Sequence, residues 1–449
     1  MRSDGAKDVK IWTEWDLRLE AMAEIGRAYM HGGLKEQLAL LGLLFLQRRN
    51  RLSLPDTTCD ALNIALTLAR AIEEHARVQG RPLSDHLLSG LRNIDPIVTD
   101  RWLAIASENW PIEGFVEWFA AMLDELPFTH HHDTPASLSR LVASLLSGQS
   151  PNAILDPACG TGGILAAMAD EFEQATLFGR EINSEAWAWS ELRFLVRDQR
   201  NNTNLSFGNA FVDEPFPRLA PKEGFDIIVT NPPFGMRIDS HTVGLLSRRP
   251  NSRIPESSGR LSSETAYIQE VITCLSDSGI AAVIVPNGFL SRGGVDQKLR
   301  ETLIQDDIVQ TVVGLPERVF APGTTIETAI LFLSRQKLDN QKGRVLFLDA
   351  RRLGQREGVR TVLDDESAEQ IESGYTNWRD KDGFSRVVSF KDIDPTSFSL
   401  SPTRYIKPAT RLAMISPHDR RSRIDDLDAR YAALCREYDA LRSKLTQPS

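Results

Sequence analysis

The residues best suited to chemistry stand in a proline-rich turn, Asn231-Pro232-Pro233-Phe234, which follows the apolar run Phe225–Val229. Two successive prolines fix φ and remove two N–H donors, so the turn presents an amide side chain and bare carbonyls. A planar ring with an exocyclic amine fits this arrangement. Its amine can donate to the Asn231 side chain and the Pro232 carbonyl, while the ring stacks on Phe234. Two acceptors would localise the lone pair of the amine for attack on a methyl group. The alternative is an ordinary strand–helix turn.

A glycine-rich loop lies earlier in the chain, between the apolar run Ala153–Leu155 and a helical stretch that opens near Ile164. Glycine adopts positive φ and lets the backbone approach a ligand closely at a helix N-terminus. Such a loop also occurs in nicotinamide-binding folds, or it can be a mere turn. Two acidic residues favour a cofactor-binding loop over these alternatives. Asp156 can hold a positively charged amine, and Glu181, which ends the next strand, can take both ribose hydroxyls.

These two motifs resemble those of amino-methyltransferases that use S-adenosylmethionine, and Asn-Pro-Pro-Phe is characteristic of the enzymes that make N6-methyladenine in DNA. More of the chain resembles the modification subunit of type I restriction–modification systems. The segments concerned are Leu40–Leu46, Asp133–Leu138, Thr265–Ile268, Val285–Gly288, Gly314–Pro316, Thr328–Leu331 and Arg404–Ile406. The resemblance implies a DNA adenine N6-methyltransferase with S-adenosylmethionine as its cofactor. It places Asp133–Leu138 over the methionine end of that cofactor, which adds Thr134 to the site.

The predicted catalytic residues are therefore Asn231, Pro232, Pro233 and Phe234. The predicted cofactor-binding residues are Thr134, Asp156, Ala158, Gly160, Thr161, Gly162, Gly163, Glu181, Asn209 and Ala210. The last two follow Gly208 at the end of a possible third strand, where an amide contact to the adenine ring and an ordinary turn are equal alternatives. We predict no metal site, because the four cysteines are widely spaced and the adjacent histidines at 130–132 cannot share one helix face.

The apolar runs that carry these motifs alternate with helical stretches, which predicts a doubly wound α/β sheet of the S-adenosylmethionine-dependent methyltransferase (Rossmann-like) type. The predicted strands are Ala153–Leu155, Leu177–Gly179, Phe225–Val229, Ile280–Val285, Ile308–Val313 and Ala329–Leu333. The last two lack a clear helix between them, so they can pair antiparallel.

Four parts are expected along the chain. A helical N-terminal domain spans 1–126, with Trp12, Trp15, Trp102, Trp110 and Trp118 in its core. The α/β catalytic domain spans 127–350, an extension of mixed short elements spans 351–406, and a basic linker and heptad helix span 407–449. In that helix, apolar residues recur alternately three and four residues apart from Ile424 to Leu445. It can dock on its own domain, but we favour contact with another chain.

The charge balance excludes a globally basic nucleic-acid coat, since 52 Lys and Arg face 61 Asp and Glu, a net charge of −9. It leaves room for local basic patches. One is a loop with five arginines, which can bind phosphates and hold a flipped nucleotide or can simply be solvated: Arg237, Arg248, Arg249, Arg253 and Arg260. A second basic stretch, Lys407–Arg423, can meet the DNA backbone or lead into the heptad helix.

The expected partners are double-stranded DNA, a specificity subunit that docks on the heptad helix, and in some assemblies a restriction subunit. No base-reading module is recognisable in the chain, so sequence choice must come largely from elsewhere, and the resemblance implies that a separate specificity subunit supplies it. We expect a cytoplasmic protein without membrane contact, because the longest apolar run, Leu38–Leu46, is too short to span a bilayer and the N-terminus lacks a signal peptide. The alternatives are methylation of RNA or of a protein glutamine, and a non-catalytic scaffold.

Overall fold

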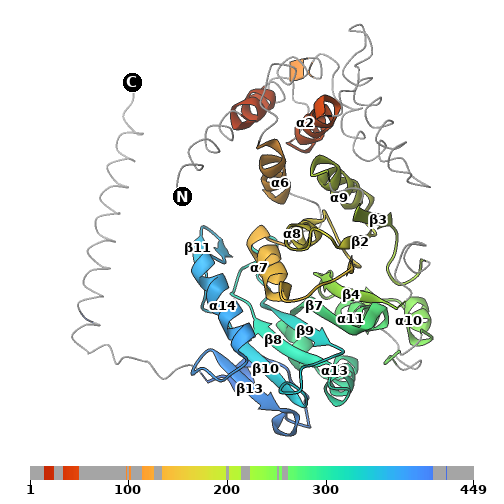
Figure 1. The fold of residues 1–449 in the computed structure, drawn as a ribbon, viewed down its shortest axis with the longest axis vertical. Coiled ribbons are helices and arrows are strands. Elements are labelled where there is room, and N and C mark those ends of the chain that lie inside the picture. Colours follow the sequence, from red (N-terminus) through yellow and green to blue (C-terminus); the bar gives the residue numbers. More distant parts are fainter. Residues whose placement is uncertain are drawn as a thin grey trace, which may run out of the picture.

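A central nine-stranded sheet organises the chain, as seen in a computed structural model (Figure 1). The structure describes residues 15–24, 34–49, 98, 101–102, 114–125, 134–198, 202–213, 223–249, 252–254, 261–407 and 421. The strands of the sheet are β1 (Ala153–Asp156), β2 (Thr176–Glu181), β3 (Thr203–Phe207), β4 (Phe225–Thr230), β7 (Leu275–Pro286), β8 (Val309–Gly314), β9 (Thr328–Ser334), β10 (Arg344–Asp349) and β13 (Ser385–Ser389).

The strand order is β13-β10-β8-β9-β7-β4-β1-β2-β3. The strands from β3 to β7 are parallel, in the order of a doubly wound sheet. β9 is antiparallel to both of its neighbours, β7 and β8. All six predicted strands are confirmed, and so is the antiparallel pairing of 308–313 with 329–333, in which Val313 lies opposite Ile330.

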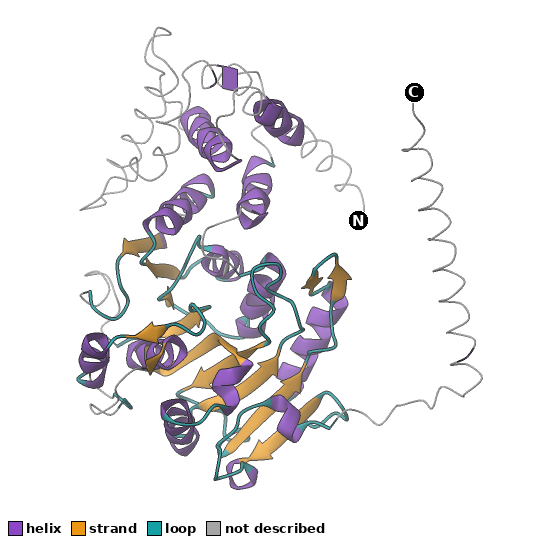
Figure 2. Cartoon of the chain, turned by 180° about the vertical axis from the view of Figure 1, so that it is seen from behind, coloured by secondary structure: helices purple, strands orange, loops and turns teal. Residues whose placement is uncertain are grey.

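Helices cover both faces of this sheet (Figure 2). They are α7 (Ala136–Leu146), α8 (Gly163–Glu171), α9 (Ser184–Val196), α11 (Ser263–Cys274), α12 (Asn287–Ser291), α13 (Val295–Gln305), α14 (Asp365–Asn377) and α15 (Pro402–Tyr405). α7, α8 and α14 share an apolar core with one face, and α11 and α13 with the other. Because both faces are covered, the central strands are largely apolar, and all seven residues of β9 are buried.

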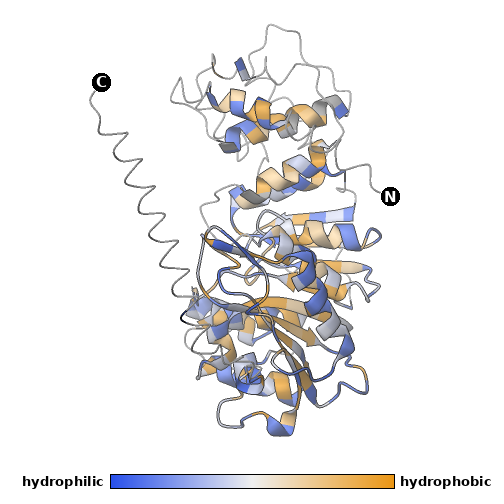
Figure 3. Ribbon diagram, turned by 90° about the vertical axis from the view of Figure 1, so that its left-hand side faces the viewer, coloured by the Kyte–Doolittle hydropathy of each residue, from blue (hydrophilic) through white to orange (hydrophobic). Residues whose placement is uncertain are grey.

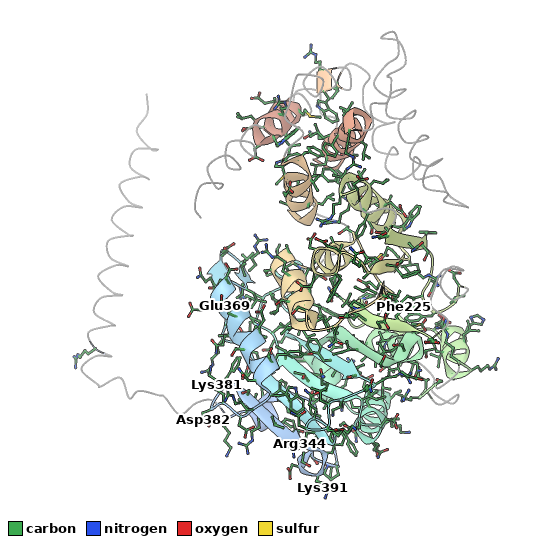
Figure 4. The ribbon with its side chains drawn as sticks, viewed as in Figure 1. Phe225, Arg344, Glu369, Lys381, Asp382 and Lys391 are labelled. Carbon is green, nitrogen blue, oxygen red and sulfur yellow. The ribbon has the colours of Figure 1, made fainter. Side chains whose placement is uncertain are left out.

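The colours of Figure 3 follow this burial, with apolar residues concentrated in the strands and polar residues on the outer loops and helices. Two labelled side chains in Figure 4 show the contrast. Phe225 is buried where β4 begins, whereas Glu369 is exposed on α14. In the ranges described above, every helix falls short of the length and apolarity that crossing a membrane requires.

The N-terminal region is helical where it is described, in residues 15–24, α2 (Leu34–Arg49) and α6 (Phe115–Glu125). Trp15, Trp102 and Trp118 are fully buried there, as predicted, while Trp12 and Trp110 lie outside the described residues. α2 is buried on more than one face, since Leu38–Leu41 are all inaccessible. The same core takes in apolar side chains of α9, which joins the helical region to the sheet.

Regular elements form in the predicted arginine-rich loop and in the predicted extension of mixed short elements. The loop after the catalytic turn forms β5 (Arg237–Ile238), which pairs with β6 (Leu261–Ser262), and helix α10 (Ser240–Ser247). The acidic and glycine-rich stretch 354–383 forms α14 and the hairpin of β11 (Gln355–Glu357) with β12 (Arg360–Val362). The histidines at 130–132, Arg260 and the heptad helix from Ile424 lie outside the described residues.

Candidate active site

A cavity of about 590 Å³ opens where β2, β1 and β4 end. These strands are adjacent and parallel, so the loops that follow them meet at one edge of the sheet. The cavity brings together seven of the predicted site residues: Ala158, Gly160, Glu181, Asn209, Ala210, Asn231 and Pro233. The other seven, Thr134, Asp156, Thr161, Gly162, Gly163, Pro232 and Phe234, are not part of its lining.

The glycine loop takes its shape from left-handed residues. Gly160 has φ +55° and Gly162 has φ +81°, and Gly162 is the residue before α8 begins at Gly163. A Cβ at Gly162 would lie 2.7 Å from Ser190 Oγ and 3.1 Å from the ring of Phe194, so a side chain has no room there. Gly162 thus lies on the side of the loop that packs against α9, while Gly160 lies on the side that lines the cavity.

Glu181 is fixed by backbone amides on both sides. Its Oε2 accepts a hydrogen bond from Gly160 N at 2.9 Å, and its Oε1 accepts one from Asn183 N at 2.7 Å. The carboxylate therefore ties the glycine loop to the end of β2 and lies on the cavity wall. This is the position in which a ribose diol would meet both oxygens.

Asp156 lies beneath the loop with only 1% of its surface exposed. Burial raises its pKa to about 7, an effect strengthened by the charge of Glu181 and opposed by the hydrogen bond from Ala158 N at 3.0 Å. A buried carboxyl group of this kind becomes easier to ionise when a cation approaches. Asp156 can thus stabilise a positively charged ligand electrostatically from beneath the glycine loop, although it does not line the cavity.

Asn231 is held by the segment that precedes α7. Its Nδ2 donates a hydrogen bond to Thr134 Oγ1 at 3.0 Å, and its side chain is 8% exposed at the cavity. Because the NH₂ group is engaged on Thr134, the amide oxygen is the part of the side chain that can accept from a ligand amine. Thr134 was predicted to bind the cofactor, and here it orients the amide.

Phe234 packs edge-on against Phe320, with ring centroids 5.9 Å apart and an interplanar angle of 87°. It is 8% exposed and belongs to the core beneath the sheet edge. Sequence analysis did not identify Phe320, which lies in an irregular segment 86 residues further along the chain (320 − 234). No local pattern marks a single aromatic residue in such a loop.

The turn at Asn209 is closed by its own side chain. Asn209 Oδ1 accepts a hydrogen bond from Phe211 N at 2.8 Å, and Asn209 N donates to Asp213 Oδ2. The side-chain oxygen is thus used within the turn, and the NH₂ group is the part that can meet an adenine acceptor. Ile182 follows Glu181 on the same wall and is 60% exposed, so it offers an apolar surface that the sequence motifs did not single out.

The arginines after the catalytic turn have different partners, which revises their predicted role in holding phosphates. Arg249 forms an ion pair with Glu270, and it donates to the carbonyl of Phe211 at 2.9 Å. Arg253 pairs with Asp306 at 2.7 Å. Arg249 thus ties the end of α10 to the cavity wall at Phe211, whereas Arg253 ties the following segment to the C-terminal end of α13. Arg237 is exposed and lines the cavity, so it remains a candidate for contact with a charged ligand.

The sequence model of the N-6 DNA methylase family matches residues 129–412, which is more than half of the chain. The chain belongs to the N-6 DNA methylase family. The family segment contains the whole sheet and both motifs, so the cavity described above lies within it.

Two curated relatives of this chain are methylase subunits of type I restriction enzymes. The chain is 29% identical to that of MjaVIII from Methanocaldococcus jannaschii over 297 residues, which is 61% of this chain and 49% of that protein. It is 26% identical to that of HindI from Haemophilus influenzae over 295 residues, 62% of this chain and 63% of that protein. The chain spans about half the length of the first relatives that it matches.

Solved structures share the fold of this chain. The methyltransferase subunit of a type I restriction–modification system from Streptococcus thermophilus superposes with a TM-score of 0.67 at 17% identity, covering 89% of this chain and all of that one. A modification subunit of a type I restriction enzyme from Vibrio vulnificus gives 0.62 at 18% identity, covering 86% of this chain and 94% of that one. The predicted methyltransferase-type α/β fold is therefore confirmed.

Proposed function

We propose that this N-6 DNA methylase transfers a methyl group from S-adenosylmethionine to the N6 amine of adenine in DNA, as the modification subunit of a restriction–modification system. The observation that carries the proposal is the meeting of two motifs in one cavity. Asn231 and Pro233 of the proline turn line the same cavity as Gly160 and Glu181 of the nucleoside-binding loops. Family membership and the relatives named above support the same reaction.

The residues around the cavity fit S-adenosylmethionine. A volume of about 590 Å³ is within the usual range for a ligand site. In our proposal the Glu181 carboxylate binds the ribose diol, Asn209 and Ala210 contact the adenine ring, and Asp156 stabilises the positive charge. Thr134, Ala158 and the loop Gly160-Thr161-Gly162-Gly163 complete the proposed binding site. When bound, the cofactor supplies an activated methyl group.

The proline turn would receive the target base. In our proposal the adenine amine donates to Asn231 Oδ1 and to the Pro232 carbonyl, while Pro233 keeps the turn rigid and the ring stacks on Phe234. Positioning and electrostatics do this work without a strong base. Adenine must leave the duplex to enter, since its amine is otherwise enclosed in the base stack.

Methyl transfer to three kinds of acceptor tests the proposal. The full chain is produced together with the products of its neighbouring genes and given methyl-labelled S-adenosylmethionine with DNA, RNA or protein. We expect label in DNA, on N6 of adenine, and none with an Asn231→Ala chain. Label in RNA alone or in a protein glutamine alone would replace DNA as the substrate, and no transfer at all would indicate a scaffold.

Cofactor affinity should depend on pH through Asp156. Because its pKa in the free site is about 7 and the bound cofactor carries a positive charge, binding favours the ionised carboxyl group. The dissociation constant should rise by up to about tenfold for each pH unit below 7 and level off above that pH. Calorimetry between about pH 5.5 and 7.5 measures it. Asp156→Asn should abolish the slope, and a flat wild-type profile would contradict this role for Asp156.

We also propose that the chain is organised as 1–126 helical, 127–350 catalytic, 351–406 extension and 407–449 docking helix. In this scheme a specificity subunit binds the heptad helix from Ile424 onward, and a restriction subunit can join the complex. Cutting the chain before Ile424 should weaken that association by at least about tenfold, since it removes the apolar seam. Size exclusion with the purified partner measures this, and an unchanged complex would refute the docking role.

A further inference from the structure

The N-terminus of α11 contacts the catalytic turn directly. After β6 the chain enters α11 at Ser263 and Glu264, and both residues are completely inaccessible to solvent. Helix capping does not require them, because the preceding residue, Ser262, caps the helix by accepting a hydrogen bond from Thr265 N. Two buried polar side chains therefore face the turn for a reason other than starting the helix.

Their hydrogen bonds engage the backbone of the turn at successive atoms. Ser263 Oγ donates to the Pro233 carbonyl at 2.6 Å and accepts from Met236 N at 3.1 Å. Ser263 N also donates to the carbonyl of Met236 at 2.8 Å. Between these contacts, Glu264 Oε1 accepts a hydrogen bond from Gly235 N at 3.0 Å. Gly235 has φ +67°, so this bond holds a left-handed residue where the turn reverses.

This pattern of bonds engages the turn just after Pro232, a buried residue that is not part of the cavity lining. The two prolines have no N–H to offer, and the amides that follow Phe234, Gly235 N and Met236 N, are bound by Glu264 and Ser263. Within the described part of the chain, no hydrogen bond reaches the carbonyl of Pro232. The contacts at Pro233, Gly235 and Met236, which directly follow Pro232, thus restrict the direction of this carbonyl without occupying it.

A nearby positive charge stabilises the buried carboxyl group of Glu264. The Arg292 guanidinium lies 3.7 Å from its Oε2, and the same arginine bonds to Asp296 at 2.5 Å. A negative charge in the first turn of a helix is also favoured by the helix dipole. Because Arg292 keeps Asp296 as a partner, replacing Glu264 does not leave an isolated cation.

We propose that Ser263 and Glu264 are positioning residues that hold the Pro232 carbonyl and the Asn231 amide in the geometry needed for methyl transfer. They act through the backbone of the turn, to which both side chains are hydrogen-bonded. The inference rests on the proposed function, since the turn needs this precision only if it binds a reacting amine. Loss of either side chain should lower kcat and leave the affinity for S-adenosylmethionine nearly unchanged.

The test compares three variants of the full chain in its complex. Glu264→Ala should lower kcat by about ten- to a hundredfold, since a hydrogen bond to a charged group is lost. Glu264→Gln keeps an acceptor of the same length and should stay within about fivefold of wild type. Ser385→Ala is the matched control, because it removes a buried hydroxyl that donates to the Arg379 carbonyl, far from the turn. It should leave kcat unchanged.

Hydrogen exchange at Gly235 and Met236 gives a second readout that needs no activity. In Glu264→Ala both amides should exchange at least about tenfold faster than in wild type, with the other core amides unchanged. If that variant does not fold, Ser263→Ala, which removes only a hydroxyl, is measured in its place. Unchanged kcat with unchanged exchange would overturn the proposal. A wild-type chain that methylates no DNA would count against the proposed function, and the exchange comparison would still decide whether these residues hold the turn.

Discussion

Replacing Asn231 by alanine is expected to lower methyl transfer to DNA by about a hundred- to a thousandfold, which is the usual loss when a preorganised hydrogen-bonding group is removed from a reacting centre. The cavity contains this amide on the side where Pro233 also lines it. Removing the amide takes away the acceptor that would localise the lone pair of the target amine. Because Glu181 and the glycine loop are untouched, the dissociation constant for S-adenosylmethionine should stay within about threefold of wild type. Single-turnover kinetics and calorimetry measure the two quantities.

A contrasting variant separates chemistry from packing. Thr134→Val removes the acceptor of the Asn231 NH₂ group and leaves the amide oxygen in place. Its expected loss is smaller, about tenfold, because only the orientation of the amide is relaxed. If Asn231→Ala retained activity within tenfold of wild type, or if it lost the cofactor as completely as the activity, the proposed role of the amide would be wrong.

Glu181→Ala should weaken the binding of S-adenosylmethionine by at least about a hundredfold, or about 2.7 kcal/mol. The carboxylate has two functions in this account. It accepts from Gly160 N and Asn183 N, which fixes the glycine loop, and it is placed to accept from the ribose hydroxyls. Alanine removes both functions, and the part-buried amides of Gly160 and Asn183 lose their hydrogen-bond acceptor. Calorimetric titration with S-adenosylmethionine measures the effect.

The matched control for this variant is Glu171→Ala. Glu171 is exposed at the end of α8, the helix that the same glycine loop begins. Its loss should change affinity by less than about twofold, as expected for a solvated surface charge. An affinity for Glu181→Ala within threefold of wild type would show that the ribose is bound elsewhere.

The sheet was predictable from the sequence because its strands are covered on both faces. Such strands are short continuous apolar runs between turn residues, and every one of the six predicted runs coincides with a strand. The antiparallel neighbours were also predictable, since the segment between Val313 and Ala329 has no helical pattern. The glycine loop and the proline turn were also predictable, because each motif consists of consecutive residues.

The elements around the site could not be predicted so well, because their signals are weak or distant in sequence. α14 has few buried side chains, Ser367 and Ile371, so its acidic sequence resembles a loop. The arginines near α10 read as a phosphate-binding patch, yet Arg249 and Arg253 find acids on other elements. A charged residue in a loop does not reveal a partner that folding brings from elsewhere in the chain.

The contacts of Ser263 and Glu264 could not be predicted for the same reason, because their partners are distant in sequence. Glu264 reaches an amide 29 residues earlier in the chain, at Gly235. The sequence shows only a polar start to a helix there, which is ordinary. The depth at which Asp156 is buried is likewise set by the meeting of β1 with its neighbours, so its raised pKa follows from the fold and not from the motif.

Mapping of methylated bases in cellular DNA tests the central claim most directly. The DNA is compared from cells that carry the wild-type gene, a deletion, or the Asn231→Ala gene. The account predicts N6-methyladenine at one defined sequence in the wild-type strain only, with both other strains lacking it at that sequence. The same N6-methyladenine pattern in all three strains would contradict the assignment of DNA adenine methylation to this chain.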